Sequence, residues 1–371
     1  KVTCVNVPVF IEYAMSPNGS MIALRGKDGL IHLFNTTTQE LISLELCQPT
    51  QEFLWDEYSY YSGALLWSPN ARYLAFTGVT ELPCDILDQA NIYIYDTLAN
   101  NITNLTNNVP VSGGFITPSS WSPDSEWLIL YGAWSQRDTN ELDWQSVLIS
   151  HQGIGFRAIA SHYQTCRLIW SPDTTWLASN TGCFESSGTG SDLIFIPFDF
   201  DVLSNATETV NYIDEIVPPL HFGHRPTSGW TSRYTSPIWV NNQIAVAYRE
   251  LAPISGGYLM NGEMESYSSK GIVAIDISTM TETMLADRSS ADNTTQIGNW
   301  FISRQNEDFL FFNPLIDKEL VLPATMMPCV VRDSIQISTQ GSYIAIVHNC
   351  TFDGTHLFIY DTSQLDNPLF D

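Results

Sequence analysis

Two histidines three residues apart form the most suggestive short cluster for chemistry. The segment His221-Phe222-Gly223-His224-Arg225 could supply two imidazole ligands to a metal ion. Spacing along the chain identifies no third ligand, so we interpret the segment as a solvated or packed loop. We therefore expect no metal site and no cofactor.

The motifs of the common hydrolytic enzymes are absent from the sequence. There is no Gly-x-Ser-x-Gly elbow and no His-Glu-x-x-His. Asp199 and Asp201 resemble part of a calcium-binding loop, but the neighbouring Phe198, Phe200 and Leu203 fit the end of a strand better. Paired carboxylates carry little information in a chain with 40 acidic residues. The sequence predicts no catalytic residue.

A repeated ten-residue stretch organises the elements that would position any functional residue. Its clearest copy is Trp67–Phe76, in which Trp-Ser-Pro-Asn is followed by an apolar run rich in strand-forming residues. Proline favours the second position of a type I turn, and Asn or Asp is common beside it. Each copy therefore predicts a β-hairpin. The seven copies lie near residues 15–24, 67–76, 121–130, 170–179, 239–248, 302–312 and 337–347.

The spacing of the copies predicts the fold class. The serines of the first four copies are 52, 54 and 49 residues apart. A period of this length in all-β units is typical of a propeller, whereas a β-sandwich would contain such turns only by chance. We predict an all-β, seven-bladed β-propeller of four-stranded antiparallel blades that occupies residues 1–371 as a single domain. Val2–Val7 is expected to complete the last blade and to close the ring.

The hairpins resemble the PD40 (WD40-like) repeats of TolB-like β-propellers. The resemblance rests on Trp-Ser-Pro-Asp/Asn, on the following Tyr/Trp-Leu-Ala/Ile strand, and on the later Ile92–Asp96 and Leu357–Asp361. The glycine that usually follows the turn acid is present only at Gly19 and Gly341. The family implies the fold and no particular reaction, because its members bind proteins, accompany hydrolase domains or serve as periplasmic and surface modules.

The long connections are expected on one face of the ring, where function concentrates in such folds. Aromatic side chains in these connections could line a binding rim, or could merely pack the loops onto the ring. The predicted binding residues are Trp55, Tyr58, Tyr61, Trp134, His224, Arg225, Trp230 and Tyr258.

Charge and composition limit the partners. The net charge is −25, so nucleic acid and anionic membrane surfaces are disfavoured. No apolar run approaches the roughly 20 residues that span a bilayer. We expect an extracellular or periplasmic, secreted protein. Glycosylation sequons are predicted at Asn18, Asn35, Asn101, Asn205, Asn293 and Asn349.

Cysteine positions predict three disulfides. Cys166 and Cys329 precede the inner strand of their units, while Cys183 and Cys350 follow the next strand, so we pair Cys166 with Cys183 and Cys329 with Cys350. Because they flank the second unit, Cys47 and Cys84 form a third expected pair. The alternative is a set of buried thiols in a reducing compartment.

Three functional hypotheses follow. The first is a non-catalytic propeller that binds a protein or glycan through its loop-rich face, since the ring leaves no room for a separate hydrolase domain. The second is a structural subunit of a surface layer or filament, formed by self-assembly. The third is a glycan-active hydrolase with acidic residues at the channel mouth, which two convergent carboxylates would favour.

Overall fold

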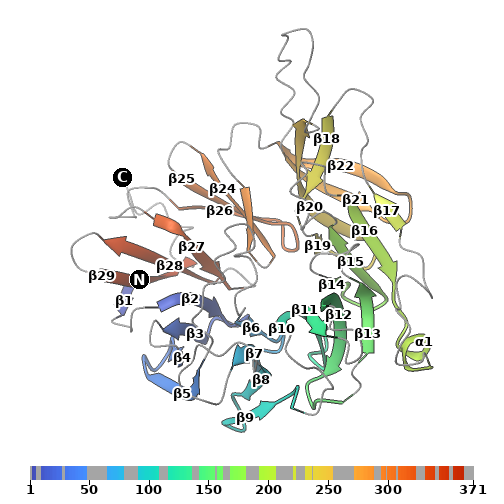
Figure 1. Ribbon diagram of the computed structural model, residues 1–371. Helices are drawn as coiled ribbons and strands as arrows, with labels where there is room; N and C mark the ends of the chain where they lie inside the picture. Colours follow the sequence, from blue (N-terminus) through green and yellow to red (C-terminus); the bar gives the residue numbers. More distant parts are fainter. Residues whose placement is uncertain are drawn as a thin grey trace. The chain divides into compact units, whose positions relative to one another are not determined.

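A computed structural model of the chain was determined. It describes residues 2–5, 10–26, 30–47, 65–78, 91–107, 116–135, 142–154, 157–161, 168–180, 192–205, 220–222, 230–235, 237–253, 271–287, 294–297, 299–305, 308–322, 331–338, 342–350 and 354–362. These residues form seven antiparallel sheets and one short helix, so the all-β prediction is confirmed (Figure 1). In the described part of the chain, no helix is long and apolar enough to cross a membrane.

The chain divides into two compact units. The first comprises Lys1–Arg157 and Leu322–Asp371, and the second comprises Ala158–Val321. We number the sheets 1 to 7 in the order in which they begin along the chain, leaving aside the N-terminal strand Val2–Val5. Sheets 1, 2 and 7 lie in the first unit, and sheets 4 and 5 in the second. The boundaries fall within the last strand of sheet 3, Arg157–Ser161, and the last strand of sheet 6, Lys318–Leu322.

Sheets 1 to 3 are regular four-stranded meanders. Sheet 1 contains β2 (Phe10–Met15), β3 (Met21–Gly26), β4 (Leu30–Asn35) and β5 (Leu41–Cys47). Sheet 2 contains β6 (Leu66–Trp67), β7 (Tyr73–Gly78), β8 (Asn91–Asp96) and β9 (Asn101–Asn104). Sheet 3 contains β10 (Ile116–Trp121), β11 (Trp127–Ser135), β12 (Leu142–Ser150) and β13 (Arg157–Ser161).

Sheet 7 joins the first strand of the chain to the last three. It contains β27 (Val331–Ile337), β28 (Tyr343–Cys350), β29 (Gly354–Asp361) and β1 (Val2–Val5). β1 lies antiparallel to β29, with Val2 opposite Tyr360 and Val5 opposite Leu357 (Figure 1). The predicted pairing of the N-terminal segment with the last strand is therefore observed, over Val2–Val5.

Sheet 4 includes the only described helix. Its strands are β14 (Ile169–Trp170), β15 (Trp176–Asn180), β16 (Leu193–Pro197) and β17 (Leu220–Phe222). After β16, α1 (Phe200–Asn205) begins behind Asp199, whose Oδ1 accepts the Asp201 and Val202 N–H groups as an N-cap. The sequence interpretation of this segment as a strand end was wrong, because the cap and the packing of Phe198 and Phe200 around Trp170 favour a helical turn.

The first strand of sheet 5 is interrupted. β18 (Trp230–Tyr234) and β19 (Ile238–Trp239) both pair with β20 (Ile244–Pro253), followed by β21 (Gly271–Asp276) and β22 (Thr281–Asp287). Pro237 lies between the two short strands and lacks the N–H that a continuous ladder requires.

In sheet 6 the predicted hairpin is formed by a different pair of strands from the pair expected. It contains β23 (Thr294–Ile297), β24 (Trp300–Gln305), β25 (Asp308–Asn313) and β26 (Lys318–Leu322). The hairpin expected as the first in this unit, 302–312, is the second, because β23 precedes it and pairs with β24. Without Pro, the Ile302-Ser303 turn signal was too weak to fix which pair of strands it joined.

The serine of each Trp-Ser-Pro turn fixes the hairpin. Ser68 is fully buried; its Oγ donates to Asn70 Oδ1 at 2.7 Å and accepts the Tyr73 N–H at 2.9 Å. Ser16, Ser122 and Ser171 make the same pair of bonds. The residue after the Asn or Asp has a left-handed backbone, with φ of 71° at Gly19, 59° at Ala71, 66° at Ser125 and 64° at Thr174.

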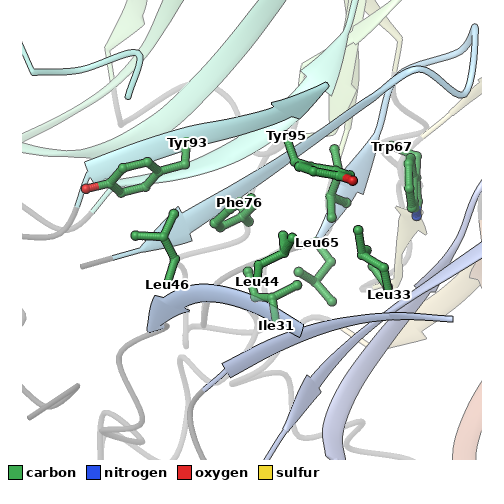
Figure 2. Packing of buried hydrophobic residues seen from close by; sticks show 11 residues of the cluster. Ile31, Leu33, Leu44, Leu46, Leu65, Trp67, Phe76, Tyr93 and Tyr95 are labelled. Carbon is green, nitrogen blue, oxygen red and sulfur yellow. The ribbon is translucent and has the colours of Figure 1, made fainter. Parts of the chain in front are cut away.

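Apolar side chains from neighbouring sheets form the cores. Figure 2 shows such a cluster, in which Trp67, Phe76, Tyr93 and Tyr95 of sheet 2 pack on side chains of sheet 1. The latter are Ile31, Leu33, Leu44 and Leu46. Indole groups add a repeated link between sheets, since Trp67 Nε1 donates to Ala14 O at 3.0 Å and Trp121 Nε1 donates to Leu66 O at 3.2 Å. In the second unit, Trp239 Nε1 donates to Ile169 O at 3.2 Å.

Candidate functional site

Glu12 and Arg25 form a buried ion pair on β2 and β3, the first two strands of sheet 1. They lie opposite each other in the β2–β3 register, next to an irregularity between Phe10 and Glu12. Glu12 Oε2 lies 3.1 Å from Arg25 Nε. The other carboxylate oxygen, Oε1, accepts the Leu65 N–H at 3.1 Å. The pair therefore connects sheet 1 to the backbone that enters sheet 2.

The strand alternation determines which way Glu12 points. Ala14, two residues further along β2, packs against the cluster shared with sheet 2. Tyr13 points to the opposite side, where its hydroxyl donates to Ala345 O of sheet 7 at 3.0 Å. Glu12 thus lies on the sheet 2 side, near the end of β2 that is remote from the Ser16 turn.

Burial makes the Glu12 carboxyl unusual. The side chains of Arg25 and Glu12 are 9% and 26% exposed. Burial raises the pKa of Glu12 to about 7, while the Arg25 charge and the Leu65 N–H act in the opposite direction. A carboxyl group with a pKa near neutrality and some access to solvent can both take and give a proton at physiological pH. Sequence reasoning missed this residue, although the available signal was an acid and a base inside otherwise apolar strands.

A second buried ion pair in the second unit has a different arrangement. Glu282 accepts the Tyr234 hydroxyl on Oε2 at 2.9 Å and pairs through Oε1 with Arg249 Nη1. Tyr234 is 3% exposed and packs in the core between sheets 4 and 5, and Asn180 Nδ2 donates to its carbonyl oxygen at 3.3 Å. Because both Glu282 oxygens are occupied inside a core, this cluster fits a structural role.

Most of the predicted binding residues lie outside the described residues. These are Trp55, Tyr58, Tyr61, His224, Arg225 and Tyr258. Trp134 and Trp230 were expected in loops but lie in strands, opposite Asp143 in β11–β12 and opposite Pro253 in β18–β20. These strands extend further than the tight hairpin pattern indicated. The eight residues are not brought together in the described part of the chain, so the predicted aromatic rim stays a prediction.

The predicted disulfides and the two-histidine segment, for which no metal site was expected, are also largely outside the described residues. Cys47 ends β5 and Cys350 ends β28, whereas Cys84, Cys166, Cys183 and Cys329 are not described. His221 was expected in a loop but lies in β17, opposite Ile194. Among the described residues, no group of three or more His, Cys, Asp or Glu side chains could hold a metal ion.

The predicted sequons lie in several settings. Asn18 is in a turn, Asn35 is the last residue of β4, and Asn101 begins β9. Asn205 is the last residue of α1, and Asn349 lies in β28 opposite Thr355. Asn293 is outside the described residues.

Comparison with known proteins shows a likeness of fold. No family model matches the chain, and no curated protein matches it. An oligogalacturonate lyase in complex with manganese is 12% identical, with a TM-score of 0.58 over 97% of this chain and 90% of that chain. The oligogalacturonate lyase of Vibrio parahaemolyticus is 12% identical, with a TM-score of 0.56 over 97% of this chain and 91% of that chain. A prolyl endopeptidase structure is 11% identical, with a TM-score of 0.57 over 96% of this chain and 48% of that chain. These structures show that the chain has a propeller-type fold.

The comparison corrects the prediction of a non-catalytic protein. That prediction depended on the argument that a ring occupying the whole chain leaves no room for a catalytic domain. The two lyases are matched over 90% and 91% of their own length, so enzymes of this fold exist without a large additional domain. The absence of hydrolase motifs in the sequence therefore does not indicate a binding protein or a structural subunit. The manganese belongs to the first of these lyases, and among the residues described here no group of side chains fits it.

Proposed function

We propose that this protein is a carbohydrate-active enzyme of the lyase class, in which Glu12 is the base that removes a proton from the sugar. The observation that carries the proposal is the Glu12 carboxyl, with its pKa of about 7, held between Arg25 Nε and the Leu65 N–H. Lyase cleavage of a uronate glycan requires a base to remove the proton beside the sugar carboxylate. A group with a pKa near the working pH is suited to that step.

The composition of the site favours elimination over hydrolysis. Glycoside hydrolases commonly use two carboxyl groups about 5–10 Å apart. In the described part of the site, Glu12 is accompanied by a guanidinium instead of a second carboxyl. Arg25 is the more buried of the two, so it acts on the substrate through Glu12. The likeness of fold to oligogalacturonate lyases is an analogy that supports the same class.

We also propose that the seven sheets are the blades of one ring over residues 1–371, of the TolB-like type. The support is the number of sheets formed by the described residues, the β1–β29 pairing and the repeated tryptophan-to-carbonyl links between successive sheets. In such a ring the first strand of each blade is innermost, so the proposal places Glu12 of β2 near the axis.

A glycan substrate outside the cell fits this proposal. The sequons and the net charge of −25 support an extracellular or periplasmic protein, and the predicted disulfides require that setting. The partner is then a glycan, bound on the side of the long connections, where the predicted aromatic residues could stack on sugar rings.

The test is a lyase assay on oligogalacturonates and on other uronate oligosaccharides, followed by the ultraviolet absorbance of the unsaturated product. Glu12→Gln keeps an acceptor for the Leu65 N–H and should lower kcat by about 10²–10⁴-fold. Glu126→Gln, an exposed acid in the turn after β10, is the matched control and should not change kcat. Full activity in Glu12→Gln would overturn the role of Glu12. Absence of elimination on every uronate substrate would overturn the lyase class.

A further inference from the structure

Sequons on the hairpin side of sheets 1 and 2 differ in how far their amide groups are committed to the fold. We infer that Asn18, Asn35 and Asn101 are acceptors of N-linked glycans and that the neighbouring sequon at Asn104 is not. This inference depends on the proposed secretion of the chain. It goes beyond the proposed function, because it assigns a modification to the end of the sheets opposite Glu12.

The Asn18 side-chain oxygen accepts several hydrogen bonds, whereas its nitrogen takes part in none among the described residues. Asn18 Oδ1 accepts the Ser16 hydroxyl at 2.9 Å, the Ser20 N–H at 3.0 Å and the Ser20 hydroxyl at 2.8 Å. The side chain is exposed, and Nδ2 has no hydrogen-bond partner among the described residues. A sugar on Nδ2 leaves all three bonds to Oδ1 in place.

Asn35 repeats this arrangement in the turn after β4. Asn35 Oδ1 accepts the Thr37 and Thr38 N–H groups at 2.9 and 3.0 Å. Within the described part of the chain, its Nδ2 likewise has no partner. The two turns are adjacent, because Thr36 Oγ1 donates to Gly19 O at 2.7 Å.

Asn101 is exposed on an outer strand. It is the first residue of β9, the outermost strand of sheet 2, and pairs through its backbone with Asp96. No hydrogen bond to its side chain is found among the described residues. A glycan there would extend from the sheet edge into solvent.

Asn104, three residues further on, is bonded through both polar atoms. Its Nδ2 donates to the Tyr93 hydroxyl at 3.3 Å, and its Oδ1 accepts the Thr106 N–H at 3.0 Å. Thr106, the hydroxyl residue of this sequon, is 7% exposed; its Oγ1 donates to Asn91 Oδ1 and accepts the Ile92 N–H. A sugar on Asn104 would compete with the packing of Tyr93 in the core of Figure 2.

The chemistry is a group transfer without oxidation or reduction. Asn Nδ2 forms a bond to the anomeric carbon of an oligosaccharide supplied by a lipid-linked pyrophosphate donor. The bond between that carbon and the phosphate oxygen breaks, the lipid pyrophosphate leaves, and Nδ2 loses one proton. The chain itself supplies only the amide and the sequon hydroxyl residue.

The test is expression of the full chain behind a leader in eukaryotic cells, with intact mass and glycopeptide mapping of secreted and retained material. The variants Asn18→Asp, Asn35→Asp and Asn101→Asp keep an acceptor oxygen and remove the amide nitrogen. Asp124, Asp173 and Asp96 already occupy the corresponding turn positions of other sheets, so the first two changes should leave the turns intact. Each variant should lose one glycan mass, and the triple variant should lose three of the glycans present.

Asn104→Asp is the matched control, and it should change the glycan mass by nothing. A glycan mapped to Asn104, or an unoccupied Asn18, Asn35 or Asn101 in both secreted and retained chains, would overturn the inference. The lyase assay on the same preparations is independent of occupancy. Glycans at the three sites without lyase activity would reject only the proposed function, and activity without glycans would reject only this inference.

Discussion

Glu12 and Arg25 face each other across β2 and β3, with Glu12 Oε2 3.1 Å from Arg25 Nε, yet burial outweighs the nearby positive charge. The pKa of Glu12 therefore rises from about 4.5 to about 7 instead of falling, as it would for an exposed ion pair. The protein consequently takes up a proton on folding between these two pH values.

This proton uptake predicts a pH-dependent stability. Because the pKa of Glu12 is raised in the folded state, protonation of Glu12 stabilises the fold. This contribution to the free energy of unfolding is complete below about pH 4.5 and is lost as pH rises to about 7. Relative to Glu12→Gln, the wild-type free energy of unfolding should fall by up to about 3 kcal/mol over this interval. Urea unfolding of both proteins at several pH values measures the difference. A constant difference would show that Glu12 keeps its ordinary pKa.

Removal of the Arg25 charge should shift the titration of Glu12 upward. Arg25→Met retains much of the volume of the side chain but removes the charge that lowers the pKa of Glu12. In the proposed enzyme, the limb of the pH–rate profile that reports ionisation of the base should move to higher pH. Arg72→Met, whose guanidinium pairs with Asp96 in sheet 2, is the control and should leave the profile in place. An unshifted profile for Arg25→Met would indicate that Arg25 has only a packing role.

The left-handed residue of each hairpin predicts opposite effects at two sites. Thr174 is β-branched with φ of 64°, so Thr174→Gly should stabilise the protein by about 1 kcal/mol, less the added chain entropy of glycine. At Gly19, with φ of 71°, an added Cβ would lie 2.5 Å from Tyr343 Cδ2, so Gly19→Ala should destabilise by about 1–2 kcal/mol. Thermal unfolding of both variants measures these effects. A stable Gly19→Ala would show that the Tyr343 ring can move aside.

The net charge predicts an effect of salt on the proposed reaction. A chain of net charge −25 repels a uronate substrate at long range, and salt screens this repulsion. kcat/KM on oligogalacturonates should therefore rise with ionic strength at low salt. A neutral oligosaccharide serves as the control and should show little change. A fall in kcat/KM would indicate a locally basic binding surface.

The repeat made the fold predictable from the sequence. Ser16, Ser68, Ser122 and Ser171 are each required by two hydrogen bonds in a turn of fixed shape, so their spacing reported the hairpins directly. Sheet 6 was shifted by one strand because nothing as specific marks its first turn. α1 was missed because the packing of Phe200 against Trp170 joins residues 30 positions apart in the chain, although the Asp199 cap is local.

The candidate site was much less accessible to sequence reasoning. Glu12 is one of 40 acids, and its pKa depends on packing against Leu65 and sheet 2, which no local pattern records. The aromatic residues chosen instead were selected by type and by an expected loop position. Trp134 and Trp230 show the weakness of that criterion, because strand length depends on pairing partners that lie far away in the sequence.

The pairing of β1 with β29 imposes an order on the assembly of sheet 7. Val2 and Tyr360 are partners, so β1 gains this neighbour only after more than 350 further residues have been synthesised. Until then, one edge of β1 and one edge of β29 remain without their ladder bonds and are open to pairing with other chains. Among the described strand pairings this one joins the residues most distant in sequence, so we expect sheet 7 to be completed more slowly than sheets 1 to 3, which are built from adjacent hairpins.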